Sequence, residues 1–384
     1  MASNYRKLGD FIREVDRRNV ENRQDNLLGL SVAKCFIPSI ANTVGTDFRK
    51  YKVVEKGQFA YIPDTSRRGD KIAIALLEDW DSGLVSNVYT VFEVVGEGLL
   101  PKYLELWFRR PEFDRYARFK SHGSVREIFD WEQLCDVELP IPSLEEQQRI
   151  VDSFNAIERR IDSLKQLNDK LAATAQSYFD EQHGQHPEWQ IVRIDEICQV
   201  KGGKRLPAGE ELASEATDHP YIRVRDLNEA RYLVYDPNMA HITNETHNQI
   251  RRYIVDAGDV VISIVGTIGL IAIIDESLHG ANLTENCDKL TAFKSVNPLW
   301  AFLYLNSGIG QDSIREATVG AVQAKLPLKN IQALMIPIPP DNEGRAIDGV
   351  INPLFASICL NQKEILLLQR TKVTLLNNIS SLGR

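Results

Sequence analysis

Cysteine is scarce in this sequence and never occurs in the paired spacing that zinc or redox chemistry requires. The 384 residues include five cysteines, and no Cys-x-x-Cys motif is present. The five lie far apart, at Cys35, Cys135, Cys198, Cys287 and Cys359. Their odd number and wide separation argue against a disulfide framework, so we expect a reducing compartment, the cytoplasm.

Long apolar runs are also lacking. The most apolar stretch, Val260 to Ile274, contains Ser263, Gly266, Thr267 and Gly269, and it is too short to span a bilayer. Because β-branched residues flank its Gly-Thr-Ile-Gly turn, the stretch predicts a strand, a turn and a second strand. The N-terminal sequence MASNYRKLGDFIREVDRR lacks the apolar core of a signal peptide.

The sequence has no excess of positive charge. Asp and Glu total 53 against 45 Lys and Arg, which gives a net charge of -8 and a pI near 5.5. This balance excludes a basic nucleic-acid coat, so any DNA binding must be local or shared with partner proteins. Hydrophobic residues make up 43% and charged residues 26%, which is typical of a folded protein, and the length predicts two or three domains.

Familiar catalytic motifs are missing as well. The chain has no GxSxG or HExxH motif, no dinucleotide fingerprint after a strand, and no Asn/Asp-Pro-Pro-Tyr motif of amino-methyltransferases. The segment KGGK lacks the spacing of a phosphate-binding P-loop. His183 and His186 have a metal-like spacing, but they lie in the polar stretch EQHGQHPEW, which we interpret as a linker. We therefore expect no catalytic residue and no metal site.

The chain contains an internal repeat. LPIPSLEEQQRI, from Leu139 to Ile150, aligns with IPIPPDNEGRAI, 197 residues later. The same offset places HGSVR, which ends at Arg126, on VGAVQ, which ends at Gln323. A period near 200 residues is too long for a solenoid and indicates a duplicated domain with its trailing segment. One polypeptide thereby acquires the pseudo-twofold character of a dimer.

Each half ends in a stretch with the 3.5-residue apolar period of a coiled coil. The first stretch comprises Ile150, Phe154, Ile157, Ile161, Leu164, Asn168, Leu171, Ala175 and Tyr178. The second comprises Ile347, Ile351, Leu354, Ile358, Asn361, Ile365, Leu368, Lys372, Leu375, Ile379 and Leu382. The alternative is two amphipathic helices that each pack only on their own domain.

In an antiparallel pair of helices, a core position of one type faces a core position of the other type. Asn168 and Asn361 occupy the two different types, so antiparallel pairing can bring them opposite each other. The same register sets apolar residues opposite one another in nearly every layer, and Ile157 opposite Lys372 is the one poor layer. A buried amide pair satisfies its hydrogen bonds only in register, so it fixes the alignment at some cost in stability. Asn352 and Pro353 predict a bend or a restart in the second helix.

The sequence thus predicts an α+β fold with two similar mixed α/β domains separated by two long helices. The boundaries we expect are 1–142 and 184–340 for the domains, 143–183 for the central helix and 341–384 for the C-terminal helix. Within the domains, Pro101 to Arg118 and Pro298 to Ala317 are helical patches. In the second repeat Gly344 stands in place of Gln147, which affects the local capping of that helix start.

Local basic clusters are the candidate nucleic-acid contacts. Arg, Lys and Gln on loops can clamp phosphates and read base edges in the major groove, whereas each cluster alone is also compatible with a solvated surface. The clusters are Lys201, Lys204 and Arg205; Arg223 and Arg225; Arg67, Arg68 and Lys71; and, in the matched Gly-x-Val loops, Arg126 with Gln323 and Lys325.

In the order of its motifs the chain resembles the specificity (S) subunit of type I restriction-modification systems. In each half a strand motif, AGDVVISIVGTIG or more loosely KGQFAYI, precedes a Gly-x-Val-Gln/Arg loop, then Pro-Ile-Pro with a following Glu, then a long helix. The resemblance implies two target-recognition domains, each reading one half of a split DNA site, with helices that set the spacing. It adds Ser124 to the candidate DNA contacts.

The resemblance also implies partners. The helices would bind two methylation subunits, which supply S-adenosylmethionine and the chemistry, and restriction subunits that use ATP and Mg would join them. This chain would then bring sequence selection alone, without catalysis or a cofactor. A helix over residues 143–182 would span roughly 60 Å, enough to separate two domains by a helical turn of DNA. The alternatives are a non-catalytic protein-interaction scaffold with paired binding domains and an enzyme whose active site is unrecognised.

Overall fold

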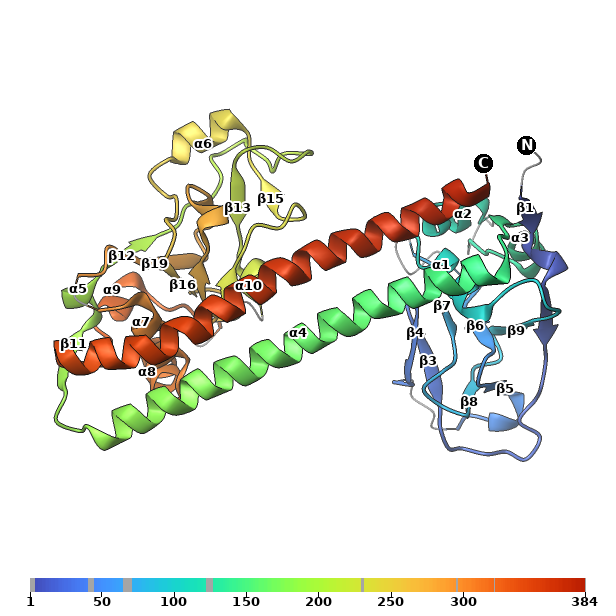
Figure 1. Cartoon of the computed structure of the whole chain (residues 1–384), viewed down its shortest axis with the longest axis horizontal. Helices are drawn as coiled ribbons and strands as arrows, with labels where there is room; N and C mark the ends of the chain where they lie inside the picture. The colour runs from blue at the N-terminus through green and yellow to red at the C-terminus, as the bar shows by residue number, and fades with distance from the viewer. Residues whose placement is uncertain are drawn as a thin grey trace. The chain divides into compact units, whose positions relative to one another are not determined.

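A computed structural model of the chain describes residues 4–40, 45–64, 71–121, 127–228, 231–294, 296–320 and 322–383 (Figure 1). The chain divides into two compact units. Unit 1 comprises Met1–Arg160 with Leu368–Arg384, and unit 2 comprises Ile161–Leu367. Each unit therefore contains one mixed α/β domain together with a segment of each long helix.

Unit 1 is built on a four-stranded antiparallel sheet whose two faces carry different partners. Alternation sends Phe59, Tyr61 and Phe92 to a core under the helices, while Ala60 and Val91 face a second core formed with the smaller sheets. The strand order is β2 (Ile12–Val15), β9 (Thr90–Val94), β6 (Phe59–Tyr61), β7 (Ile74–Leu76). The smaller sheets pair β3 (Leu28–Ser31) with β4 (Cys35–Pro38) and β5 (Lys52–Glu55) with β8 (Ser82–Val85). The helices are α1 (Pro101–Phe108), α2 (Pro111–Lys120) and α3 (Trp131–Cys135).

Unit 2 contains the same central sheet with one more strand. Its order is β12 (Gln199–Gly202), β19 (Cys287–Thr291), β16 (Val260–Ser263), β17 (Ile271–Ile274), β14 (Tyr232–Leu233). Unit 2 also has a three-stranded sheet in the order β15 (Ala240–His241), β13 (Pro220–Ile222), β18 (Asn282–Leu283). Two short helices of the unit are α5 (Ile194–Ile197) and α6 (Asn244–Ile250). The helices α7 (Pro298–Asn306), α8 (Gly308–Ala317) and α9 (Leu328–Gln332) complete it.

The strand-turn-strand predicted for residues 260–274 is therefore confirmed as β16 and β17, which pair antiparallel. Gly266 and Gly269 of the turn have φ values of 81° and 83°, a region that favours glycine.

The two units repeat one another in detail. The helices α1, α2 and α3 reappear as α7, α8 and α9 at the offset of 197 residues that the sequence motifs define. The hydrogen bond from Tyr103 Oη to the Pro140 carbonyl, at 3.0 Å, recurs as one from Trp300 Nε1 to the Pro337 carbonyl, at 2.8 Å. In both units the strand just before a long helix pairs antiparallel with an earlier strand: β10 (Glu138–Pro140) with β1 (Tyr5–Lys7), and β20 (Met335–Ile338) with β11 (Gln190–Arg193).

Each predicted helical patch is two helices rather than one. Before Pro111, Arg110 is extended, with ψ of 135°, because the proline ring disfavours a helical residue ahead of it. In unit 2, Ser307 is extended and its hydroxyl accepts a hydrogen bond from the N–H of Gly310, at 3.1 Å, so a new helix begins there.

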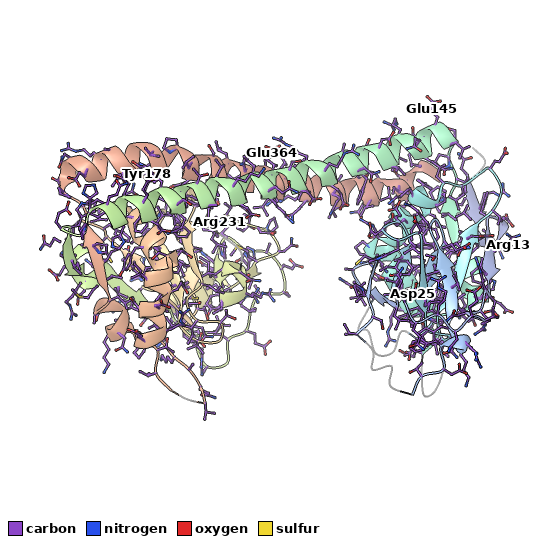
Figure 2. All side chains as sticks on the ribbon, turned by 90° about the horizontal axis from the view of Figure 1, so that it is seen from below. Arg13, Asp25, Glu145, Tyr178, Arg231 and Glu364 are labelled. Atoms are coloured by element: carbon purple, nitrogen blue, oxygen red, sulfur yellow. The ribbon has the colours of Figure 1, made fainter. Side chains whose placement is uncertain are left out.

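The two long helices are α4 (Leu144–Gln185) and α10 (Asp341–Ile379). α4 has 42 residues, which corresponds to about 63 Å at 1.5 Å per residue. Of the bend or restart predicted near Pro353, the restart is wrong, because that proline lies inside α10. Pro353 and Gly349, the residue four positions earlier, are both exposed, so water can reach the Gly349 carbonyl that the proline leaves without its helical donor. Arg231, labelled in Figure 2, forms an ion pair with Asp169 of α4 at 3.1 Å within unit 2.

The two helix starts differ in one buried side chain. In unit 1 the fully buried Gln147 accepts a hydrogen bond from the Leu100 N–H at 2.8 Å and donates to the Gly98 and Pro142 carbonyls, both at 2.9 Å. It thereby ties the start of α1 to α4. In unit 2 Gly344 takes this place and borders a cavity of about 390 Å³.

We expect Gly344→Gln to stabilise unit 2 by about 1 to 2 kcal/mol, measured by urea unfolding. A Cβ at this position would lie 3.5 Å from Pro339 Cγ, an ordinary contact, so the side chain fits. The gain combines better helix propensity with new hydrogen bonds in the cavity. Gly349→Gln is the matched control, because a Cβ at Gly349 meets open space, and it should give only the propensity gain of about 0.5 kcal/mol. Equal gains in the two variants would contradict the account.

Candidate nucleic-acid interface

The Gly-rich loop after β12 is held against the segment that joins β18 and β19. The Gly203 N–H donates to the Cys287 carbonyl at 3.0 Å, and the Lys204 N–H donates to the Leu283 carbonyl at 2.8 Å. A Cβ on Gly203 would lie 2.0 Å from the Thr284 carbonyl, so this close approach requires glycine. The side chains of Lys201, Lys204 and Arg205 are exposed; Lys204 and Arg205 lie beside residues 283–287, whereas Lys201 pairs with Lys289 in the sheet.

The second basic cluster of unit 2 reaches the same segment from β13. The Thr284 N–H donates to the Ile222 carbonyl at 3.0 Å, and Arg223 follows directly. Asp226 accepts a hydrogen bond from the Arg223 backbone N–H at 2.8 Å, while Nε and Nη2 of Arg223 are buried without a hydrogen-bond partner in the described part of the chain. Arg225 is exposed.

The Gly-x-Val loop of unit 2 is connected to this segment through the residues that follow β16. Val319 and Lys325 exchange two backbone hydrogen bonds, at 2.8 and 2.9 Å, and Lys325 also forms a bridge with Val265. The N–H of Ile264, the residue before Val265, donates to the Asn286 carbonyl at 2.8 Å. Gln323 and Lys325 are both exposed.

The structure thus brings part of the predicted set of unit 2 together at the turn Thr284–Asn286, namely Lys204, Arg205 and Arg223, with Arg225 two residues further along the chain. Lys325, in the same loop as Gln323, is connected to this turn less directly, through Val265 and Ile264, and Lys201 lies opposite Lys289 in the sheet. Arg205 Nε contacts Glu285 Oε1 at 2.9 Å, and Arg225 Nε lies 3.7 Å from Asp226 Oδ1. Their role in DNA binding stays a prediction.

The predicted residues of unit 1 are largely outside the described ranges. Arg67, Arg68, Ser124 and Arg126 are not among the described residues, and Lys71 is exposed. Unit 1 has a further basic cluster that was not among the predicted contacts, where Arg18 Nη1 donates to the Lys50 carbonyl at 3.0 Å and the Val53 N–H donates to the Arg17 carbonyl. The exposed side chains of this cluster are Arg17, Arg18, Arg49 and Lys50. The doublets Arg17-Arg18 and Arg49-Lys50 are visible in the sequence and could have been found by the same search.

A buried carboxyl group lies beneath the Gly-x-Val loop of unit 2. Asp288 is 2% exposed and pairs with Gly202 and Ile262 across the central sheet. Its Oδ2 atom is buried and has no hydrogen-bond partner in the described ranges. Burial raises the pKa of Asp288 to about 7, and the positive charge of Lys325 opposes only part of this effect.

In unit 2 the long helices meet through the two asparagines. Asn361 Nδ2 donates to Asn168 Oδ1 at 2.8 Å, which is the contact that the heptad register predicts. Leu164, Ile358 and Ile365, which belong to neighbouring layers, are buried.

We expect a double-mutant cycle on Asn168→Ala and Asn361→Ala to give a coupling free energy of about 1 kcal/mol in urea unfolding. Each single substitution leaves the other amide without its partner, whereas the double variant removes both. A coupling free energy near zero would show that the amide pair does not stabilise the register.

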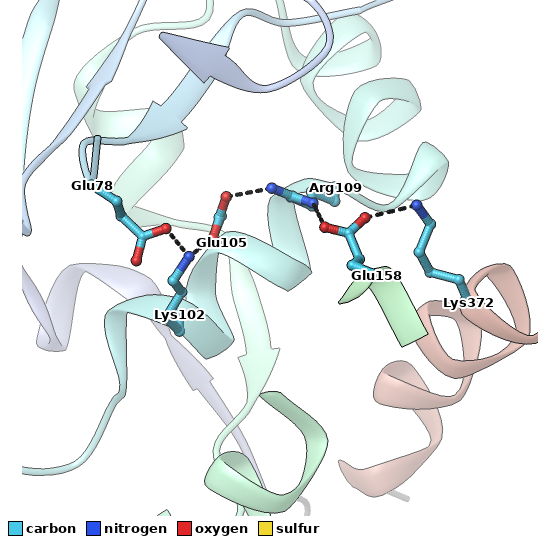
Figure 3. A network of polar contacts seen from close by, with 6 residues as sticks. All are labelled: Glu78, Lys102, Glu105, Arg109, Glu158 and Lys372. Carbon is cyan, nitrogen blue, oxygen red and sulfur yellow. Dashed lines mark hydrogen bonds and ion pairs between the residues drawn. The ribbon is translucent and has the colours of Figure 1, made fainter. Parts of the chain in front are cut away.

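In unit 1 the predicted poor layer at Lys372 is accommodated by ion pairs (Figure 3). Lys372 Nζ contacts Glu158 Oε1 at 2.8 Å, and Arg109 Nη1 lies 3.6 Å from Glu158 Oε2. Arg109 also contacts Glu105 at 2.8 Å. Burial alone would raise the pKa of Glu158, but the hydrogen bond from Lys372 and the charges of Lys372 and Arg109 outweigh it and lower the pKa below its usual value. The lysine ammonium group is thus paired rather than left in an apolar layer.

Both halves of the chain match one family model, that of the type I restriction modification DNA specificity domain, over residues 66–173 and 187–370. These two matches cover most of the chain. The chain therefore belongs to this family, and it is a specificity subunit of the type I restriction-modification class.

Relatives with assigned names agree with this membership. The chain is 24% identical over 307 residues to the type I restriction enzyme MjaIX specificity subunit of Methanocaldococcus jannaschii, a match that covers 73% of this chain and 68% of the relative. It is 23% identical to the EcoBI specificity subunit of Escherichia coli, over 60% of this chain and 54% of that one. For the HindI specificity subunit of Haemophilus influenzae, the match covers only 39% of the relative's length.

A solved structure shares the fold. The S subunit of a type I restriction-modification system from M. genitalium superposes with a TM-score of 0.56 at 15% identity, over 99% of both chains. Among the described residues, no helix is long and apolar enough to cross a membrane, and no group of three or more His, Cys, Asp and Glu side chains could hold a metal ion.

Proposed function

We propose that each unit reads one half of a bipartite DNA site and that the two long helices set the distance between the half-sites. The observation that carries this proposal is the duplication itself: the sheet order β2-β9-β6-β7 recurs as β12-β19-β16-β17, and the 42-residue helix α4 contributes to both units. Two copies of one recognition domain in one chain, joined by a continuous helix, suit a site with two separated halves.

The surface around Thr284–Asn286 supports unit 2 as a DNA-reading domain. Lysines and arginines there can neutralise phosphates, while Gln323 has the donor and acceptor that bidentate contact with adenine requires. Because the whole chain carries a net charge of -8, this local surface acts together with charges that partner subunits supply.

The partners in this proposal are two methylation subunits docked on the long helices and, in the full complex, restriction subunits. Exposed apolar side chains on the helices support docking, namely Leu167 of α4 and Val350 and Leu360 of α10. The methylation subunits supply S-adenosylmethionine and the restriction subunits use ATP and Mg, so this chain contributes sequence selection without catalysis. Such a complex acts on DNA in the cytoplasm.

Binding to labelled DNA duplexes over a series of salt concentrations, with methylation subunits present, tests this function. Lys204→Ala should weaken binding to all sequences and reduce the slope of log K against log salt by about one. Arg193→Ala is the control, because Arg193 forms an ion pair with Asp195 at 2.7 Å on β11, outside the basic surface. A protein-interaction scaffold would give no salt-dependent, sequence-selective binding, and that result would refute the proposal.

A further inference from the structure

A fully exposed valine occupies the tip of the Gly-x-Val loop in unit 2. Val322 is 96% exposed, so it contributes nothing to the core of its own unit. The repeat places Val125 at the same position in the first half, followed by Arg126 where the second half has Gln323. The duplication has therefore kept an aliphatic residue and varied the hydrogen-bonding residue beside it.

The two ends of the loop that contains Val322 are held by backbone hydrogen bonds. Val319 and Lys325 close it with two backbone hydrogen bonds, and the Leu326 N–H donates to the Ile264 carbonyl at 3.0 Å. Leu326 itself is fully buried, which anchors the loop at its base. Gly320 has a φ of 96°, and a Cβ there would lie 2.6 Å from the Gln323 carbonyl, so only glycine fits. The described ends of the loop that contains Val322 are thus held by the fold.

The surroundings of Val322 identify the chemistry of its partner. Gln323 is its neighbour in the chain, and the exposed cation Lys325 closes the same loop through its backbone hydrogen bonds with Val319. A partner for this surface is anionic overall, offers donors and acceptors to an amide, and has a small apolar group within reach. In the major groove of DNA, the C5-methyl group of thymine is that apolar group.

Building on the proposed function, we propose that Val322 contacts the C5-methyl group of a thymine in the half-site read by unit 2, beside the base that Gln323 contacts. The valine then recognises thymine by shape, and the amide distinguishes the adjacent base pair by hydrogen bonds.

Deoxyuridine substitution tests this contact, because deoxyuridine lacks only the methyl group. Each thymine of the unit 2 half-site is replaced in turn, and binding is measured for the complex of the full chain with its methylation subunits. For the wild type, one replacement should weaken binding about fourfold, as expected for loss of one buried methyl group. For Val322→Ala, binding to the thymine duplex should fall by a similar factor, and the replacement at that position should have little further effect.

Two controls keep the result specific. Val88→Ala removes another exposed valine, on unit 1, and should retain the full deoxyuridine effect. The thermal unfolding of Val322→Ala should match the wild type, because the side chain is exposed. The inference is overturned if no thymine of the half-site is sensitive to the methyl group, or if Val322→Ala keeps the wild-type sensitivity. If the wild-type complex shows no sequence-selective binding at all, the proposed function itself is refuted, and this inference with it.

Discussion

Asp114→Ala should destabilise unit 1 by about 3 to 5 kcal/mol, the largest effect that we expect from a single substitution. Lys34 is 5% exposed, and its Nζ contacts Asp114 Oδ1 at 2.5 Å and the Ile72 carbonyl at 2.7 Å. Asp114 Oδ1 also accepts a hydrogen bond from the Ile72 N–H at 3.1 Å. Without the carboxylate, the ammonium group is left as an unpaired buried charge, which urea unfolding measures as a lower free energy.

The pH dependence of this variant provides a second test. Burial already lowers the pKa of Lys34, with Asp114 opposing it, so the variant should lower that pKa further. A lysine with a lowered folded pKa is destabilised while it is protonated, so the variant should recover stability as the pH rises. Lys34→Met with Asp114→Ala should restore most of the loss, because an apolar pair needs no charge partner. Asp81→Ala, at a fully exposed site of unit 1, is the control and should change the stability little. An effect of Asp114→Ala as small as that of the control would refute the stabilising role of the Lys34–Asp114 ion pair.

Asp288→Asn should stabilise unit 2 by about 2 to 4 kcal/mol at pH 8. The pKa of Asp288 in the folded state, about 7, lies above the ordinary value of 3.8. Between these two pH values the folded state keeps a proton on Asp288 that the unfolded state has already released. The stability of the wild type therefore falls as the pH rises from about 4 to about 7. Asparagine resembles the protonated acid in shape and carries no charge, so the variant should lack this fall.

Unfolding of both proteins in urea from pH 5 to pH 8 measures the difference. The curves should approach one another at the acidic end and separate toward pH 8. Parallel curves would mean that the Asp288 carboxyl group is ionised in the folded state like an ordinary aspartate. Asp218→Asn, at an exposed site of unit 2, is the control and should not change the pH dependence.

Features that depend on local periodicity could be predicted from the sequence. The heptad period gave both long helices, and the placement of Asn168 against Asn361 followed from their two types of core position, as the 2.8 Å contact bears out. The break inside each short helical patch was missed, because the apolar pattern continues across Arg110 and Ser307 while the backbone there is extended. Local capping and proline sterics outweighed the period.

Features that depend on long-range pairing could not be predicted. The basic clusters of unit 2 were found as separate segments, but the meeting of Lys204, Arg205 and Arg223 at Thr284–Asn286 results from contacts of the β12 loop with Leu283 and Cys287 and of β13 with Asn282 and Leu283, which are distant in the sequence and which no local pattern encodes. The pairing of Lys372 with Glu158 likewise required a residue outside the apolar seam of α4. The unpartnered Oδ2 of Asp288 depends on which groups the fold brings near it.

Methylome sequencing with a helix-insertion variant tests the central claim most directly. The wild-type chain, expressed with its partner subunits in a host lacking them, should direct methylation to a site with two halves and a fixed gap. One heptad added to each helix, after Arg160 in α4 and after Leu367 in α10, should leave both half-sites unchanged and lengthen the gap by about three base pairs. A single continuous site, or a gap that the insertion leaves unchanged, would contradict the account.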